Sequence, residues 1–280
     1  MSRVTLFAIP LVLVVACPAF AQQTSTKVSD TISNSTSAES PGGAKPLSSM
    51  TPREAAEMRA DILMARKEYS QAAGTYLQIL VSEPKNAALM NKIGVAYQQL
   101  GDLDRSERFY KRAMHADKKF ASAANNCGTV EYEKKHYGKS IGLYSKALDL
   151  HADMPTVYSN LGYAYFADKQ YPQAMGSFQK ALALDPGIFD RHGLGGTVVQ
   201  QRTATDPGLF YFFVAKTYAL AGDAERAAHY LKLARDDGYA EFLSAQTDPA
   251  FAKVIKDPAL QEVLNVPPSY AGSPKKQIQN

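Results

Sequence analysis

The sequence predicts an all-α protein, a solenoid of antiparallel helix pairs, and two observations support this. Residues 53–188 repeat at a constant spacing of 34 residues, and a fifth, displaced copy follows. In every copy the eighth and twentieth residues are Gly, Ala or Ser. A fixed period of this length is typical of helical-hairpin repeats, and small residues let the two helices of a pair approach closely. The copies begin at Arg53, Ala87, Ala121, Pro155 and Gly208.

The first segment, residues 1–21, has the features of a signal peptide. Arg3 precedes an apolar run from Leu6 to Ala16, and Ala19-Phe20-Ala21 forms a small-x-small cleavage site. We therefore expect an exported protein, periplasmic or secreted. The alternative is a lipoprotein anchored to a bacterial membrane, because Val14-Val15-Ala16-Cys17 is similar to a lipobox in which Cys17 is lipidated.

Residues 22–50 are rich in Ser and Thr and contain almost no large apolar residue. Such a segment cannot bury enough surface to offset the loss of chain entropy, so we expect a disordered linker. Residues 267–280 predict a disordered tail for the same reason.

Residues 51–188 are expected to form four tandem repeats, each with two helices. The twenty-fourth residue of each copy is large, and in the first four copies it is aromatic: Tyr76, Tyr110, Tyr144 and Phe178. This side chain would fill the space beside the small residues. Gly101-Asp102 and Gly222-Asp223 suit the turn between two helices, since Gly ends a helix and Asp caps the next one.

Beyond the fourth repeat the periodicity is interrupted. Residues 189–207 are assigned to an insertion loop that contains Gly195-Gly196 and the strand-like Thr197–Gln201, and residues 208–241 to the fifth repeat. Residues 242–266 are expected to form C-terminal capping helices that begin at Asp248-Pro249 and Asp257-Pro258, because Asp at the N-cap and Pro at the first position start a helix.

Three segments carry a resemblance to the tetratricopeptide repeat family of bacterial exported type: Asn160–Tyr165, Tyr171–Ala174 and Phe178–Pro186. The resemblance implies a right-handed superhelical solenoid. It also implies that positions 2, 5, 6, 9, 12 and 13 of the first helices line a concave groove for a peptide or a partner helix. In this chain those positions give Asn91, Lys92, Val95, Gln98, Gln99, Asn125, Asn126, Thr129, Tyr132, Glu133, Ser159, Asn160, Tyr163, Phe166, Phe212 and Lys216.

Two features limit what the groove is expected to hold. The family's carboxylate clamp needs Lys, Asn, Asn, Lys and Arg at positions that are Asn91, Val95, Asn126, Thr156 and Asn160 here. Its cations are absent, which argues against capture of an acidic C-terminus. The aromatic groove residues have a second interpretation, in which they pack beneath the insertion.

The composition argues against other functions. A net charge of +4 over 280 residues is too small for a dedicated nucleic-acid binder, and two cysteines exclude a disulfide-dense scaffold. The five histidines form no metal-binding pattern, and Cys127 falls at a core position, so we expect no metal, no cofactor and no enzyme activity. An enzyme would need a pocket built by residues 189–206.

The sequence therefore predicts a non-catalytic scaffold or adaptor of the cell envelope that binds another protein or peptide. The alternative is a lipid-anchored assembly factor for pilus or outer-membrane biogenesis. Nucleic acid is not an expected partner, a membrane is one only if Cys17 is lipidated, and homo-oligomers are compatible with the sequence.

Overall fold

The computed structural model describes residues 50–190 and 206–266. The predicted signal peptide with Cys17, the linker up to residue 49, residues 191–205 of the insertion and the tail from residue 267 lie outside the described residues.

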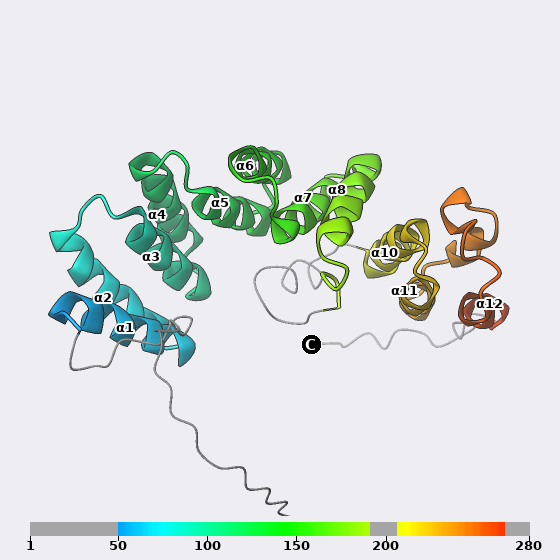
Figure 1. The fold of residues 1–280 in the computed structure, drawn as a ribbon, viewed down its shortest axis with the longest axis horizontal. Coiled ribbons are helices and arrows are strands. Elements are labelled where there is room, and N and C mark those ends of the chain that lie inside the picture. The colour runs from blue at the N-terminus through cyan, green and yellow to red at the C-terminus, as the bar shows by residue number, and fades with distance from the viewer. Residues whose placement is uncertain (1–49, 191–205, 267–280) are drawn as a thin grey trace, which may run out of the picture. The chain divides into compact units, whose positions relative to one another are not determined.

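The described chain is all-helical, as predicted, and its helices form consecutive antiparallel pairs (Figure 1). Each pair contacts the next, and α8 contacts α10. The fold class is therefore confirmed. The helices are α1 Pro52–Ala65, α2 Tyr69–Ser82, α3 Ala87–Gln99, α4 Leu103–Ala116, α5 Ala121–Glu133, α6 Tyr137–Leu150, α7 Pro155–Ala167, α8 Tyr171–Leu184, α10 Pro207–Ala221 and α11 Ala224–Asp236.

The small residues sit where a second-helix ring crosses the first helix. A Cβ atom added to Gly94 would lie 2.5 Å from the Tyr110 ring, and one added to Gly128 would lie 2.8 Å from the Tyr144 ring. Carbon atoms in contact are about 3.5–4.0 Å apart, so only glycine fits here. The same close approach occurs at Gly162, so the period of 34 reflects a packing constraint that recurs in the second, third and fourth pairs.

The small residue at position 20 has a second role in two of the pairs. The buried Ser106 hydroxyl donates to the Gly94 carbonyl oxygen at 2.8 Å, and Ser140 donates to Gly128 in the same way. A buried polar group needs such a partner. These bonds attach the second helix to the first at the point of closest approach.

The turns inside the pairs use a left-handed residue. Gly101 and Gly222 have φ values of 77° and 84°, and Lys67, Lys135 and Lys169 occupy the same position in other pairs with φ between 61° and 63°. This conformation is unfavourable for a residue with a Cβ atom. The lysine turns are therefore strained where the glycine turns are not.

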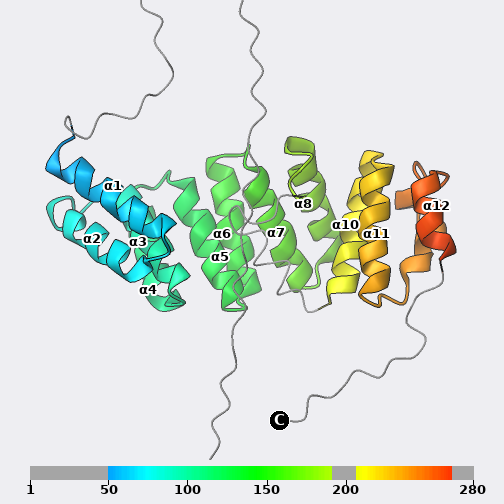
Figure 2. The same ribbon diagram turned by 90° about the horizontal axis from the view of Figure 1, so that it is seen from below.

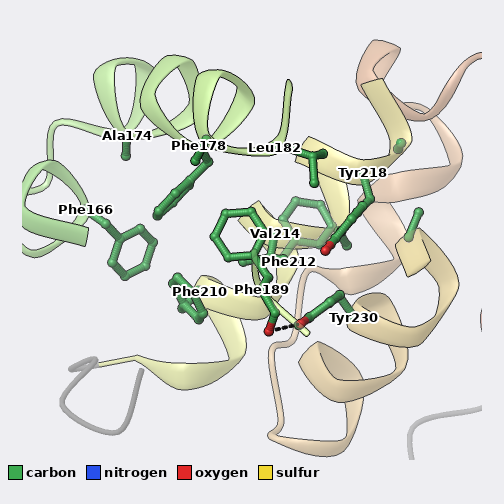
Figure 3. Close-up of a cluster of buried hydrophobic side chains, with 14 of the residues drawn as sticks. Phe166, Ala174, Phe178, Leu182, Phe189, Phe210, Phe212, Val214, Tyr218 and Tyr230 are labelled. Carbon is green, nitrogen blue, oxygen red and sulfur yellow. Dashed lines mark hydrogen bonds between the residues drawn. The ribbon is translucent and has the colours of Figure 1, made fainter. Parts of the chain in front are cut away.

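A cluster of buried hydrophobic side chains, many of them aromatic, joins α7, α8, α10 and α11 (Figure 3). The ring centroids of Phe178 and Phe189 lie 5.5 Å apart, and the Tyr230 hydroxyl donates to the Phe189 carbonyl oxygen at 3.0 Å. Phe189 is 1% exposed. The first residue that we assigned to the insertion therefore belongs to the core between the fourth and fifth pairs.

The chain after α11 continues as η2 Phe242–Gln246, η3 Pro249–Phe251 and α12 Pro258–Asn265 (Figure 2). Asp248 and Asp257 each accept a hydrogen bond from the backbone two residues later, at 2.9 Å. Phe251 and Leu260 are fully buried, and α12 contacts α11. These short helices cover apolar surface of the last pair that would otherwise face water.

Candidate functional site

A pocket of about 340 Å³ lies across the first helices of three successive pairs, α3, α5 and α7. Most of the residues that line it have an amide or a hydroxyl group in the side chain, and one has a carboxylate. The lining residues are Val95, Gln98, Gln99, Tyr110, Asn125, Asn126, Thr129, Glu133, Thr156 and Asn160.

Four asparagines connect these helices in one directional series of hydrogen bonds. Asn160 donates to Asn125 at 3.0 Å, Asn125 donates to Asn126 at 3.1 Å, and Asn126 donates to Asn91 at 3.0 Å. We call these four residues the asparagine ladder. Each interior asparagine both donates and accepts, so the ladder fixes the orientation of its amides.

The end of the ladder leaves one acceptor without a partner. Asn160 is 1% exposed, and its Oδ1 atom has no hydrogen-bond donor among the described residues. Ser159 Oγ, on the same turn of α7, is also buried and without such a partner. Buried polar atoms of this kind are rare, because desolvation without a hydrogen bond costs about 1–3 kcal/mol.

Glu133 is the carboxylate of the pocket. Its Oε1 atom accepts a hydrogen bond from Gln98 Nε2 at 2.6 Å, and Gln98 is itself held by the Tyr110 hydroxyl, which donates to Oε1 of Gln98 at 2.9 Å. Burial raises the pKa of Glu133, and the bond from Gln98 opposes the shift only in part. The pocket therefore contains a partly desolvated acid whose position is fixed by its neighbours.

The two lysines predicted for the groove are already paired. Lys92 Nζ lies 2.8 Å from Glu57 and 2.7 Å from Asp61 on α1, and Lys216 Nζ lies 2.7 Å from Asp248 before η3. Their charges are neutralised within the fold. Neither is well placed to attract an acidic partner.

The predicted aromatic groove residues lie in the interior. Tyr132, Tyr163, Phe166 and Phe212 are 5%, 1%, 5% and 4% exposed. Tyr163 stacks on Phe210 with centroids 5.1 Å apart, and the other three also contact aromatic rings. Packing between pairs uses these rings, so they offer a partner little surface.

Of the residues predicted for the groove, the structure brings together in this pocket Val95, Gln98, Gln99, Asn125, Asn126, Thr129, Glu133 and Asn160, and Asn91 joins them through the ladder. It leaves Lys216 and Phe212 beside the C-terminal segment. Tyr110 was expected only as a core ring, and its role in holding Gln98 was missed. The hydroxyl group of Tyr110 could have indicated this role in the sequence, because a ring that only fills the core does not need a hydroxyl group.

Cys127 is the cysteine of the described residues, and it is buried. Burial raises the pKa of the Cys127 thiol to about 12, so the sulfur is held in its unreactive form. No group of three or more His, Cys, Asp or Glu residues within 50–190 and 206–266 is arranged to hold a metal ion. In the same ranges, no helix combines the length and the apolar character that crossing a bilayer requires.

Comparison with known proteins agrees with this architecture. Family models described as tetratricopeptide repeat match residues 57–121 and 155–188, and a model described as TPR repeat matches residues 128–169. None of the curated proteins compared with the chain matches it. The described helices thus define a repeat protein of stacked helical hairpins.

Residues 57–121 and 128–188 thus contain tetratricopeptide repeats. Among solved structures, PilF of Pseudomonas aeruginosa is 19% identical with a TM-score of 0.50, over 76% of this chain and 86% of that chain. MamA of Desulfovibrio magneticus RS-1 is 16% identical with a TM-score of 0.48, over 68% and 96%. YrrB, described as a TPR protein with an unusual peptide-binding site, is 17% identical with a TM-score of 0.45, over 69% and 91%.

Proposed function

We propose that this protein is a non-catalytic scaffold of the cell envelope that holds an extended segment of a partner protein in the pocket across α3, α5 and α7. The observation that carries the proposal is the set of amide side chains that three successive pairs direct to one pocket. Amides both donate and accept, and so match the alternating groups of an extended backbone.

Two further features support a binding role. Tetratricopeptide repeats as a family are protein-interaction scaffolds. In addition, Asn160 is a lining residue of this pocket, and a bound segment would supply the donor that its buried Oδ1 atom lacks among the described residues.

The test is site-specific photo-crosslinking in the native cell. A photoreactive phenylalanine analogue replaces Gln99, an exposed residue of the pocket lining, or Lys146, an exposed residue on α6 outside the pocket. We expect a discrete adduct from position 99 and none from position 146. The adduct should weaken when Asn126→Ala removes two bonds of the ladder. Equal adducts from both positions would refute the placement of the partner.

The envelope location follows from residues 1–21 and remains part of the proposal. Mass spectrometry of the mature N-terminus tests it, and Gln22 as the first residue indicates signal cleavage after Ala21. A lipid-modified Cys17 would instead support the second candidate, a membrane-anchored assembly factor, which the sequence Val14–Cys17 favours. An unprocessed chain that starts at Met1 would contradict export.

A further inference from the structure

The pocket contains an acid that no cation of the described chain neutralises. Within residues 50–190 and 206–266, no lysine, arginine or histidine nitrogen forms a salt bridge with Glu133. Lys134 follows it directly, yet its Nζ atom lies 2.6 Å from both Asp104 and Glu107. Among the described residues, the Glu133 carboxylate has one hydrogen-bond partner, the neutral amide of Gln98.

This differs from the other charged side chains near the groove. Lys92 is bound by two carboxylates of α1, and Lys216 is bound by Asp248. Both lysines predicted for the groove thus have an acid supplied by the fold. A partly buried carboxylate with only a neutral partner is costly, and a cation would compensate for it.

A second, independent observation points to the same ligand chemistry. Asn160 is a lining residue of the same pocket, and its Oδ1 atom is buried and has no donor among the described residues. The ladder uses the amide nitrogen of Asn160 for Asn125, so only its acceptor is left. The Glu133 carboxylate and the Asn160 side-chain oxygen are both acceptors, so they match a ligand that donates hydrogen bonds.

We propose that the segment bound in this pocket carries a lysine or arginine whose charged group pairs with the carboxylate of Glu133, while a donor of the same segment meets Oδ1 of Asn160. This deepens the proposed function and rests on it. Lysine and arginine carry several donors and no acceptor, which fits a site of two acceptors. An acidic segment would place two carboxylates together in a pocket whose nearest lysines are already paired.

The protein would then select partners by a positive charge, whereas a cationic clamp selects them by a negative one. Tyr110 and Gln98 act as positioning residues, because the Tyr110 hydroxyl orients the Gln98 amide, and Gln98 in turn holds Glu133. Burial raises the pKa of Glu133, so acidification should protonate it more readily than an exposed glutamate and thereby weaken the pairing.

The test uses a phage-displayed library of random 12-residue peptides, selected on the full chain. The wild type is compared with Glu133→Gln, Asn126→Ala and a matched control, Asp149→Asn, which removes an exposed carboxylate on α6. We expect the wild type and the control to enrich peptides with Lys or Arg at one fixed position. The Glu133→Gln protein should lose that enrichment.

A peptide from the selection is then synthesised with its basic residue or with norleucine in its place. Loss of a charge-assisted pair should weaken binding by about tenfold or more, whether the change is Glu133→Gln or norleucine. Because both changes remove the same interaction, the combination should cost little beyond either alone. Circular dichroism checks that Glu133→Gln folds, which we expect because glutamine still accepts from Gln98.

The other outcomes separate the two proposals. Peptides that bind, depend on Asn126 and show no basic preference would overturn this inference and leave the proposed function in place. Basic peptides that bind Glu133→Gln as tightly as the wild type would also overturn it. If no peptide is retained by the wild type, both the peptide-binding function and this inference fail.

Discussion

Replacement of Gly162 by alanine should destabilise the protein, because the added methyl group has no room. A Cβ atom at Gly162 would lie 2.4 Å from Cε1 of Phe178 and 2.5 Å from its Cδ1. This is about 1 Å inside the normal contact distance of carbon atoms. The ring cannot move aside easily, since Phe178 is fully buried and its centroid lies 5.4 Å from Tyr163 and 5.5 Å from Phe189.

Two opposing effects set the size of the change. Overpacking a core costs about 1–3 kcal/mol. Alanine in place of glycine inside a helix stabilises by about 1 kcal/mol, which offsets part of this cost. Gly142→Ala on α6 isolates the second effect, because Gly142 is exposed and an added Cβ atom would meet nothing within 4 Å. We expect Gly162→Ala to lower the free energy of unfolding and Gly142→Ala to raise it.

The difference between the two variants measures the overpacking cost alone, about 1–3 kcal/mol. Urea unfolding followed by far-ultraviolet circular dichroism, with the same slope for all three proteins, provides the comparison. If Gly162→Ala proves as stable as Gly142→Ala, the close approach of glycine and ring does not explain the repeat spacing.

Three further predictions follow from the packing and the charges. Gly128→Leu should lower the melting temperature more than Gly162→Ala lowers it, since a branched side chain meets the Tyr144 ring, and an unchanged melting temperature would contradict this. Hydrogen bonds from two lysines, Lys111 first and Lys134 second, lower the pKa of Glu107 to about 2, below its unfolded value of about 4.3. The resulting stabilisation is present above pH ~4.3 and is lost as the pH falls toward 2. Glu107→Gln should therefore be less stable than the wild type at neutral pH, and acid titrations should show the two stabilities converging near pH ~2. In a Cys17→Ala background, the buried Cys127 should resist maleimide at pH 8 until urea unfolds the chain, whereas rapid labelling of the native protein would show that the third pair opens.

The sequence determined the helix pairs, because their signals are local and recur. Gly162 and Phe178 are 16 residues apart within one pair, and the same combination of small and large residues returns at Gly94 and Gly128. Repetition makes each copy evidence for the others. The sequence also predicted the amide side chains of the groove, through the resemblance to the tetratricopeptide repeat family.

The tertiary structure decided which of those residues remain open to a partner. Lys92 is held by side chains 31 and 35 residues away, and Asn126 bonds to Asn91, also 35 residues away, so their partners depend on how neighbouring pairs dock. From its sequence position, Tyr163 could equally be an exposed aromatic residue that anchors a partner. In the structure it lies in the interior against Phe210 of α10. Only the docked helices show that Glu133 keeps a neutral partner, because pairing is a property of side chains that meet across helices and not of their order along the chain.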